Sequence, residues 1–356
     1  MTGKYTNPLK YHAVRAQRSI LRTAIAPLVS WSPLSDPSEG YTVIVGCHGL
    51  LGSLLLANLE MISRQDCRGI DRIILVIDRP RAQMPKDIEP VVRSRFGSLP
   101  IEFIYYRAWQ RRIATMIGWA WVFSWMSWAM GIASTRTRFA MLHDFDAFLL
   151  EPHILLDRYK LICQRQDTYV GTRFYGGNGL LESDHLAATY ELIFDVQYVR
   201  EHFQPIDLFN HVSKHEGRTI DYDTFLWAQH QHGSASVLPI DEEHMVHPSQ
   251  MICQFTELLL HDRQPSRQPN LPLLPYFFDL GGEPNLIREH TRILSSQGVN
   301  EVPFFGRSLL LDRLSMEHAS WLRKQAARLE NTVHGEIRPH VSEYFDALER
   351  VAQQNA

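Results

Sequence analysis

Two aspartates stand one residue apart in the stretch RFAMLHDFDAFLLEP, with apolar runs on both sides. The apolar neighbours of Asp144 and Asp146 predict that both carboxylates are buried or nearly so. A buried carboxylate is costly unless it is paired, hydrogen-bonded or coordinated to a metal. Carboxylate oxygens at the end of a strand suit Mg²⁺ or Mn²⁺, which proteins hold with one or two carboxylates plus substrate phosphates. The pair therefore predicts a divalent metal site for a substrate that carries a diphosphate.

The elements that must position this pair are short apolar strands alternating with helices. We expect strands at residues 41–46, 72–78, 101–106 and 138–142. This alternation predicts an α/β fold with a mostly parallel sheet flanked by helices. Ligands of such sheets bind outside the carboxyl ends of the strands. The residues at the ends of these strands or shortly after them are Gly46, Cys47, His48, Asp78 and Asp144. We expect these residues to line one site.

The stretch from Met116 to Ser134 contains 19 residues without a charge, which is long enough to cross a membrane. Its glycines and serines, and tryptophans spread through its middle, favour a helix in the protein core instead. A membrane span and a helix lying in the membrane interface remain open. A second helix is expected at residues 184–203.

Composition excludes some classes of partner. The 356 residues carry a net charge of −3, which argues against nucleic acid as the main partner. Four cysteines without a CxxC pair predict free thiols in a reducing compartment. The amino-terminal residues lack the apolar core and cleavage site of a secretory signal, so we expect a cytoplasmic protein.

Residues 41–248 resemble the GT-A fold glycosyltransferases, which use nucleotide-diphospho-sugars, and most loosely those of the large family 2 type. YTVIVGCHG is similar to the family's first strand and nucleotide loop, although Cys47 and His48 depart from the usual polar loop. IILVIDRP resembles the second strand, which implies that Asp78 contacts the base or ribose. HDFDAF resembles the DxD motif, which implies that Asp144 and Asp146 hold Mn²⁺ or Mg²⁺ on the donor diphosphate.

Two later segments extend the resemblance. DYDTFLWAQHQHG, which ends at Gly233, is similar to a segment where a helix begins with the catalytic acid. The match implies that Asp223 is the general base of an inverting transfer, although Tyr222 stands where an acid is commonest. A cap at the amino end of a helix is the alternative role for Asp223. EEHMVHP follows where many of these enzymes supply a metal-binding histidine, which implies His247, with His244 as second choice.

The resemblance implies three regions along the chain. These are a basic arm and linker at 1–40, a GT-A catalytic domain at 41–261, and a linker with carboxyl-terminal helices at 262–356. Residues 1–35 contain five basic residues and no acid. They form either a solvated arm packed on the domain or a basic amphipathic segment that contacts anionic lipid at the inner membrane face. The carboxyl-terminal helices are expected to be an appendage or a homo-oligomer contact.

The expected activity is transfer of a sugar from a nucleotide-diphosphate donor to a hydroxyl of a glycan or lipid-linked glycan, in bacterial polysaccharide or glycolipid synthesis. Inversion is favoured over retention because one carboxylate base suits it. Two alternatives stay open. A metal-dependent phosphatase or phosphotransferase would use Asp144 as its nucleophile, and a non-catalytic scaffold of the same fold would bind no nucleotide.

Overall fold

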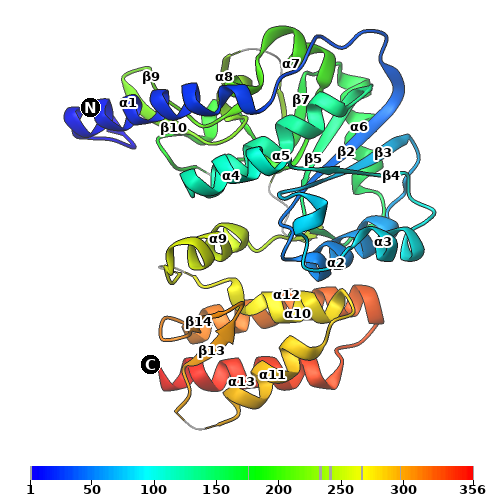
Figure 1. Cartoon of the computed structure of the whole chain (residues 1–356), viewed down its shortest axis with the longest axis vertical. Helices are drawn as coiled ribbons and strands as arrows, with labels where there is room; N and C mark the ends of the chain where they lie inside the picture. The colour runs from blue at the N-terminus through cyan, green and yellow to red at the C-terminus, as the bar shows by residue number, and fades with distance from the viewer. Residues whose placement is uncertain are drawn as a thin grey trace. The chain divides into compact units, whose positions relative to one another are not determined.

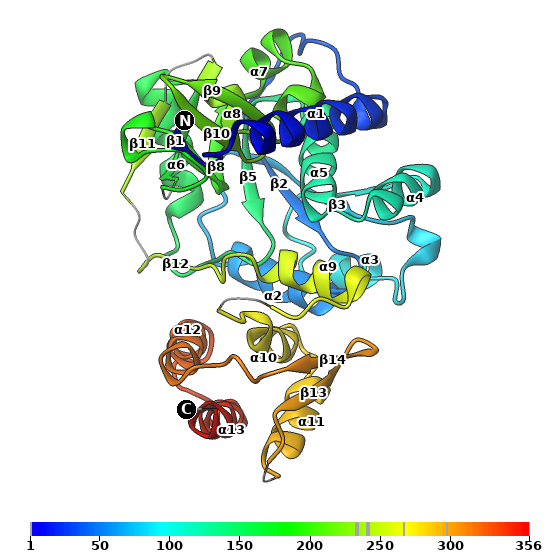
Figure 2. The same ribbon diagram turned by 90° about the vertical axis from the view of Figure 1, so that its left-hand side faces the viewer.

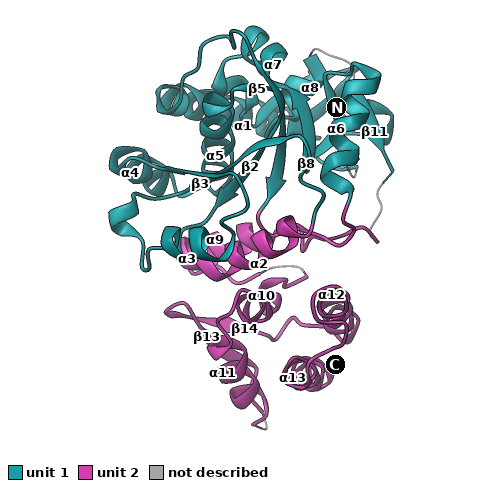
Figure 3. Ribbon diagram, turned by 90° about the vertical axis from the view of Figure 1, so that its right-hand side faces the viewer, with its two compact units in different colours: residues 1–50, 65–144, 153–241 teal, residues 51–64, 145–152, 242–356 magenta. Residues whose placement is uncertain are grey.

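A computed structural model describes residues 2–174, 176–231, 235–239, 243–265, 268–296 and 298–355. Gly233, which closes one of the segments identified above, lies outside the described residues. The chain forms two compact units that interleave along the sequence (Figure 3). Unit 1 comprises Met1–Leu50, Gln65–Asp144 and His153–Asp241, and unit 2 comprises Leu51–Arg64, Phe145–Pro152 and Glu242–Ala356. The contiguous division into three regions remains a prediction.

Unit 1 is built around a seven-stranded sheet with the order β11-β7-β8-β5-β2-β3-β4 (Figure 1). The strands are β2 (Ser38–Cys47), β3 (Ile70–Ile77), β4 (Ile101–Tyr105), β5 (Thr137–Asp144), β7 (Tyr169–Arg173), β8 (Ala187–Asp195) and β11 (Ala235–Leu238). All neighbouring strands run parallel except β8, which is antiparallel to β5 and to β7. The predicted α/β class with a mostly parallel sheet is confirmed, as are the four strands expected before the aspartate pair.

Helices cover both faces of this sheet. The helices of unit 1 are α1 (Pro8–Ile25), α3 (Glu89–Arg95), α4 (Ala108–Ile117), α5 (Ala120–Ser134), α6 (Ile154–Arg165), α7 (Val196–His202) and α8 (Leu226–Gln231). Alternate residues of β2 point to opposite faces. Ile44 and Gly46 therefore meet α5, whereas the ring of Tyr41 stacks on Tyr159 of α6 at 4.7 Å between centroids.

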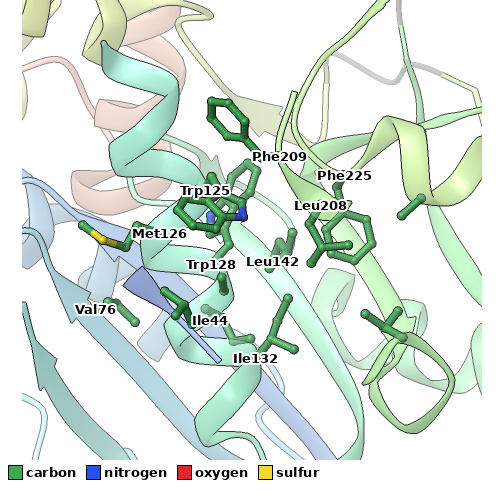
Figure 4. Close-up of a cluster of buried hydrophobic side chains, with 14 of the residues drawn as sticks. Ile44, Val76, Trp125, Met126, Trp128, Ile132, Leu142, Leu208, Phe209 and Phe225 are labelled. Atoms are coloured by element: carbon green, nitrogen blue, oxygen red, sulfur yellow. The ribbon is translucent and has the colours of Figure 1, made fainter. Parts of the chain in front are cut away.

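The tryptophan-rich stretch forms a core helix, but it is shorter than the charge-free run. Gly118 has a left-handed φ of 65°, which ends α4 and separates it from α5. Trp125 of α5 is fully buried, its indole Nε1 donates to the Pro205 carbonyl, and Phe209 packs edge-on against it (Figure 4). Among the described residues, no helix is both long and apolar enough to cross a membrane.

Gly131 allows α5 to lie directly on β2. A Cβ at Gly131 would stand 2.3 Å from Cγ2 of Ile44, a side chain with no exposed surface. We expect Gly131→Ala to lower the free energy of unfolding by about 1–3 kcal/mol, because the added methyl overpacks this contact. Urea unfolding measures the change, with Ser134→Ala at the half-buried end of the same helix as the control. Equal stability of the two variants would contradict this packing.

The prediction of a helix at residues 184–203 is wrong for most of that segment. Residues Ala187–Asp195 form β8, and only Val196–His202 are helical, as α7. Leu192 and Phe194 of β8 are buried in the same core as α5, while Glu191, directly before Leu192, contacts Arg158 of α6. Placement in the middle of a sheet thus overrides a local pattern that also fits a helix.

The amino-terminal arm packs on a small sheet of unit 1. The sheet contains the strands β1 (Thr2–Gly3), β10 (Arg218–Tyr222) and β9 (His211–His215), in that order. The arm contributes β1 and the helix α1. Figure 2 shows α1 alongside this sheet. Arg18 and Arg22 point inward and pair with Asp221 and Asp207 at 3.4 and 3.2 Å. The arm is therefore part of the folded unit.

Unit 2 contains most of the carboxyl-terminal chain and is mainly helical, and helices were expected after a linker within residues 262–356. Its elements are α2 (Gly52–Ser63), β6 (Phe148–Leu149), β12 (Met245–Val246), α9 (Met251–His261), α10 (Leu274–Leu280), α11 (Asn285–Leu294), β13 (Glu301–Phe304), β14 (Arg307–Leu310), α12 (Met316–His334) and α13 (Pro339–Gln354). The β13–β14 hairpin is an addition to the expected helices. Gly281 lets the end of α10 approach α2, because a Cβ there would lie 2.0 Å from the Ser53 carbonyl oxygen.

Candidate functional site

Four of the predicted residues of unit 1, Gly46, Cys47, Asp78 and Asp144, lie at the carboxyl ends of three adjacent strands. Gly46 at the end of β2 is the register partner of Asp144, the last residue of β5. On the other side of β2, Cys47 pairs with Ile77, and the Asp78 N–H donates to the Cys47 carbonyl at 3.0 Å. The parallel register therefore brings Asp144 and Asp78 to the same edge of the sheet, one on each side of β2, as the sequence predicted.

The turn that follows β5 is fixed within unit 2. Phe148 is buried against Phe277, with ring centroids 4.5 Å apart, and Asn58 Nδ2 donates to the Ala147 carbonyl at 2.7 Å. Strands β6 and β12 pair antiparallel, with Phe148 opposite Val246. One residue further, His247 comes beside Asp146, and its Nε2 lies 3.8 Å from the Asp146 Oδ1.

These contacts assemble a candidate metal site. One carboxylate oxygen of Asp144, one of Asp146 and a ring nitrogen of His247 lie within 4.8 Å of one another. Asp146 is buried, and the other two residues are half-buried. Two carboxylates and one imidazole fit a divalent cation, and the nitrogen favours Mn²⁺ over Mg²⁺. Among the described residues the cluster does not include His244, whose carbonyl accepts from the Leu150 N–H.

Asp78 has protein partners for both carboxylate oxygens. The Gly49 N–H donates to Oδ1 at 2.8 Å, and Arg111 Nη1 donates to Oδ2 at 2.7 Å, while Arg79 Nε lies 3.3 Å from Oδ1. Burial acts to raise the pKa of this carboxyl, but His48, the two arginines and the Gly49 N–H outweigh it and leave the pKa lowered. Asp78 is ionised at neutral pH and anchors this loop; contact with a nucleotide remains a prediction.

The residues of the β2 loop have structural roles visible in their contacts. Burial lowers the pKa of His48 to about 4, so its imidazole is neutral beside Asp78. Its Nδ1 accepts from the Leu50 N–H at 3.3 Å, which leaves the proton on Nε2. Burial also raises the pKa of the Cys47 thiol. A Cβ at Gly46 would lie 2.9 Å from Cβ of Ser127, so packing on α5 requires glycine there.

Asp223 stands between β10 and α8, three residues before the helix begins. Its Oδ1 accepts from Asn210 Nδ2 and from the Thr224 N–H, both at 2.9 Å. Its carbonyl accepts from the Leu226 N–H at the start of α8, and a side-chain cap of that helix by Asp223 remains a prediction. Burial raises the pKa of the Asp223 carboxyl, against hydrogen bonds from Thr224, Asn210 and Trp121. A raised pKa suits a group that exchanges a proton near neutral pH.

Sequence reasoning missed three polar residues in this region. Arg79 and Arg111 hold Asp78, and Asn210 holds Asp223. Arg79 directly follows Asp78, which is a weak local signal. Arg111 is 33 residues from Asp78, and Asn210 is 13 residues from Asp223, so no spacing rule links them.

Comparisons with known proteins give only distant similarities. No protein-family model and no curated protein matches the chain. Among solved structures, the chain is similar to TarS from S. aureus, with 11% identity, 88% of this chain and 55% of TarS covered, and a TM-score of 0.40. It is similar to the galactosyltransferase LgtC in complex with donor and acceptor sugar analogs, at 9% identity, 48% and 62% coverage, and a TM-score of 0.35.

A third similar structure is the mannosyltransferase PcManGT from Pyrobaculum calidifontis in complex with GDP-Man and Mn²⁺. It shares 12% identity over 98% of this chain and 97% of that one, with a TM-score of 0.39. The chain spans little more than half of TarS. These similarities are too distant to carry an argument about activity, so function must be argued from the side chains described above.

Proposed function

We propose that this chain is a metal-dependent glycosyltransferase that moves a sugar from a nucleotide-diphosphate donor to a hydroxyl of an acceptor. The observation that carries the proposal is the cluster of Asp144, Asp146 and His247 at the end of β5. Hard ligands at the carboxyl edge of a mostly parallel sheet are placed where a substrate diphosphate would bind. A separate half-buried carboxylate, Asp223, supplies the second group that such a transfer needs.

Asp144, Asp146 and His247 would hold the metal, with Mn²⁺ preferred. When bound, a divalent cation there offsets the negative charge that develops on the leaving diphosphate. The chain's own contribution is to keep the three ligands in place. Strand β5 fixes Asp144, the anchored turn fixes Asp146, and the β6–β12 pairing fixes His247.

Asp223 is the proposed general base. Its carboxylate takes the proton from the acceptor hydroxyl while that oxygen bonds to the anomeric carbon. The bond between the sugar and the diphosphate breaks in the same step, and its electron pair leaves with the diphosphate. Attack from the face opposite the leaving group gives inversion. The support for this role is the half-buried carboxyl of Asp223, whose pKa is raised by desolvation, which strengthens it as a base.

Thermal-shift titration with UDP, GDP, their sugar conjugates and CMP-sugars, each with and without Mn²⁺, tests the proposal. A ligand that binds only the folded chain raises its melting temperature. We expect one nucleotide family to do so, and only when Mn²⁺ is present. Release of phosphate from simple esters, without any effect of sugar nucleotides, would contradict the proposal and favour a phosphatase. The absence of any nucleotide shift would favour the scaffold.

We also propose that the acceptor is a lipid-linked glycan at the inner face of a membrane, approached through α1. The outward face of α1 is an apolar stripe of Leu9, Ala13, Ala16, Ile20 and Ala24, all exposed. Leu9 and Ile20 are 81% and 72% exposed. The basic residue Lys10 borders this stripe, Arg15 is exposed on the same helix, and α1 contains no acid. An apolar stripe bordered by cationic side chains fits an anionic lipid surface.

Vesicle flotation tests this surface. We expect the full chain to float with vesicles containing phosphatidylglycerol, and Leu9→Glu/Ile20→Glu to bind at least about 10-fold more weakly, because both apolar area and charge balance are lost. Ile337→Glu changes a 44% exposed aliphatic residue elsewhere and serves as the control. Full recovery of the wild-type chain in the soluble fraction would refute the contact. Self-association through the carboxyl-terminal helices stays a prediction.

A further inference from the structure

Asn210 is a buried polar residue that the function proposed above does not use. It lies directly before β9, and its side chain is 4% exposed. Its Nδ2 donates to Asp223 Oδ1 at 2.9 Å, and its Oδ1 accepts from Thr224 Oγ1 at 2.8 Å. Thr224 is also buried. Asn210 therefore makes both of its side-chain contacts to two consecutive residues of the segment that leads into α8.

The chemistry of these groups fixes the orientation of the amide. An ionised carboxylate can only accept hydrogen bonds, so the NH₂ end of Asn210 must face Asp223. The carbonyl end then faces Thr224, whose hydroxyl can donate to it. The Thr224 N–H donates to the same oxygen of Asp223, which gives that oxygen two donors in fixed positions. A flipped amide would place two acceptors against each other and is excluded on this ground.

Other charged and polar groups around Asp223 act in both directions. Asp221 on β10 raises the pKa of the Asp223 carboxyl, in addition to burial. The charge of Asp221 is itself compensated by Arg18 at 3.4 Å and by the Tyr5 hydroxyl at 2.6 Å. On α5, Trp121 donates a hydrogen bond that lowers the pKa. Asn210 thus supplies one of the few contacts that favour the charged form of the base.

We propose that Asn210 is a positioning residue that holds the Asp223 carboxylate in one orientation and keeps it ionised, with Thr224 fixing the amide. This inference rests on the proposed function, because it takes Asp223 as the general base. A hydrogen bond to the charged form is weakened once the carboxyl has accepted the proton. Asn210 therefore sets both the direction in which the base points and the pH above which it works.

The first test is the pH dependence of kcat for release of nucleoside diphosphate, with the sugar nucleotide that the thermal-shift titration identifies. In Asn210→Leu we expect the acid limb to move up by about 1 pH unit, because one donor to the ionised form is lost. Thr224→Val removes only a hydroxyl and should shift the limb less, in the same direction. A rate lowered equally at all pH values, with the limb unmoved, would overturn the proposal. Ser213→Ala on β9 is the control for local packing.

The second test does not depend on activity. Urea unfolding of the full chain at pH 5 and pH 8 compares wild type, Asn210→Leu, Asp223→Asn and the double variant. We expect Asn210→Leu to destabilise the chain more at pH 8, where the carboxylate is ionised, and this pH dependence to vanish in the Asp223→Asn background. The expected change in the folding equilibrium constant is about 10-fold. The same pH dependence in both backgrounds would overturn the proposal.

The two tests separate the failure of this inference from failure of the proposed function. Turnover of no sugar nucleotide would count against glycosyl transfer, while the unfolding cycle still decides whether Asn210 stabilises the ionised Asp223. If Asn210→Leu does not fold, Thr224→Val carries both measurements, since it loses one hydroxyl and keeps the volume of the side chain.

Discussion

Asp146→Ala is expected to abolish the metal-dependent thermal shift. Loss of a residue that merely orients a metal ligand costs 10–100-fold in affinity, so loss of a direct ligand should cost at least about 100-fold. With Mn²⁺ at 100 times the wild-type Kd, metal binding stabilises the folded chain by about 2.7 kcal/mol. A 100-fold weaker variant retains about 0.4 kcal/mol under the same conditions. Differential scanning fluorimetry with and without Mn²⁺ measures both values.

Without metal, the same substitution is expected to change the melting temperature in the opposite direction. Asp146 is 4% exposed and close to Asp144, so removing it eliminates repulsion between two carboxylates. The melting temperature of metal-free Asp146→Ala should therefore equal or exceed that of wild type. Asp157→Ala changes an exposed aspartate of α6 and should keep the full metal response. A normal response in Asp146→Ala would remove this residue from the metal site.

Asp223→Asn is expected to lower kcat by about 10²–10⁴-fold while leaving the KM for the donor nearly unchanged. The substitution keeps the shape and the acceptor oxygen that Asn210 and the Thr224 N–H contact, and it removes only the ability to take a proton. Steady-state kinetics with the identified donor measure the two constants. Asp207→Asn, which alters a part-exposed partner of Arg22 in the same unit, is the matched control. A loss confined to KM would argue for substrate binding rather than base catalysis.

The raised pKa of Asp223 also predicts a gain in stability for this variant. Because the folded state holds the proton more tightly than the unfolded state, the contribution of this carboxyl to stability is complete below its unfolded pKa. It is lost as the pH rises through the higher folded value. Asp223→Asn should therefore melt at a higher temperature than wild type at pH 8, with a smaller difference near pH 4. A variant that is both more stable and less active would mark Asp223 as a functional residue.

Local sequence signals were sufficient for the elements that carry Asp144 and Asp146. The runs that became β2, β3, β4 and β5 are short and apolar, and three of them are closed by glycine or aspartate, so their type and order were predicted correctly. Parallel strands place their carboxyl ends at one edge, and this brought Gly46 and Asp144 into register without knowledge of any contact. The errors fell where a local pattern was ambiguous. The segment Ala187–Asp195 fits a helix by itself, but its position between β5 and β7 makes it a strand.

The sequence by itself determined the fold class and the carboxyl edge of the sheet that holds Asp144, because both depend on residues that are close along the chain. Only the tertiary structure decided which histidine joins them, since the pairing of β6 with β12 brings His247 rather than His244 to Asp146. The tertiary structure also assigned Arg111 to Asp78 and Asn210 to Asp223. These contacts join segments that are distant along the chain. They form only in the folded chain, where the other tertiary contacts offset the loss of entropy on closing the loops between them.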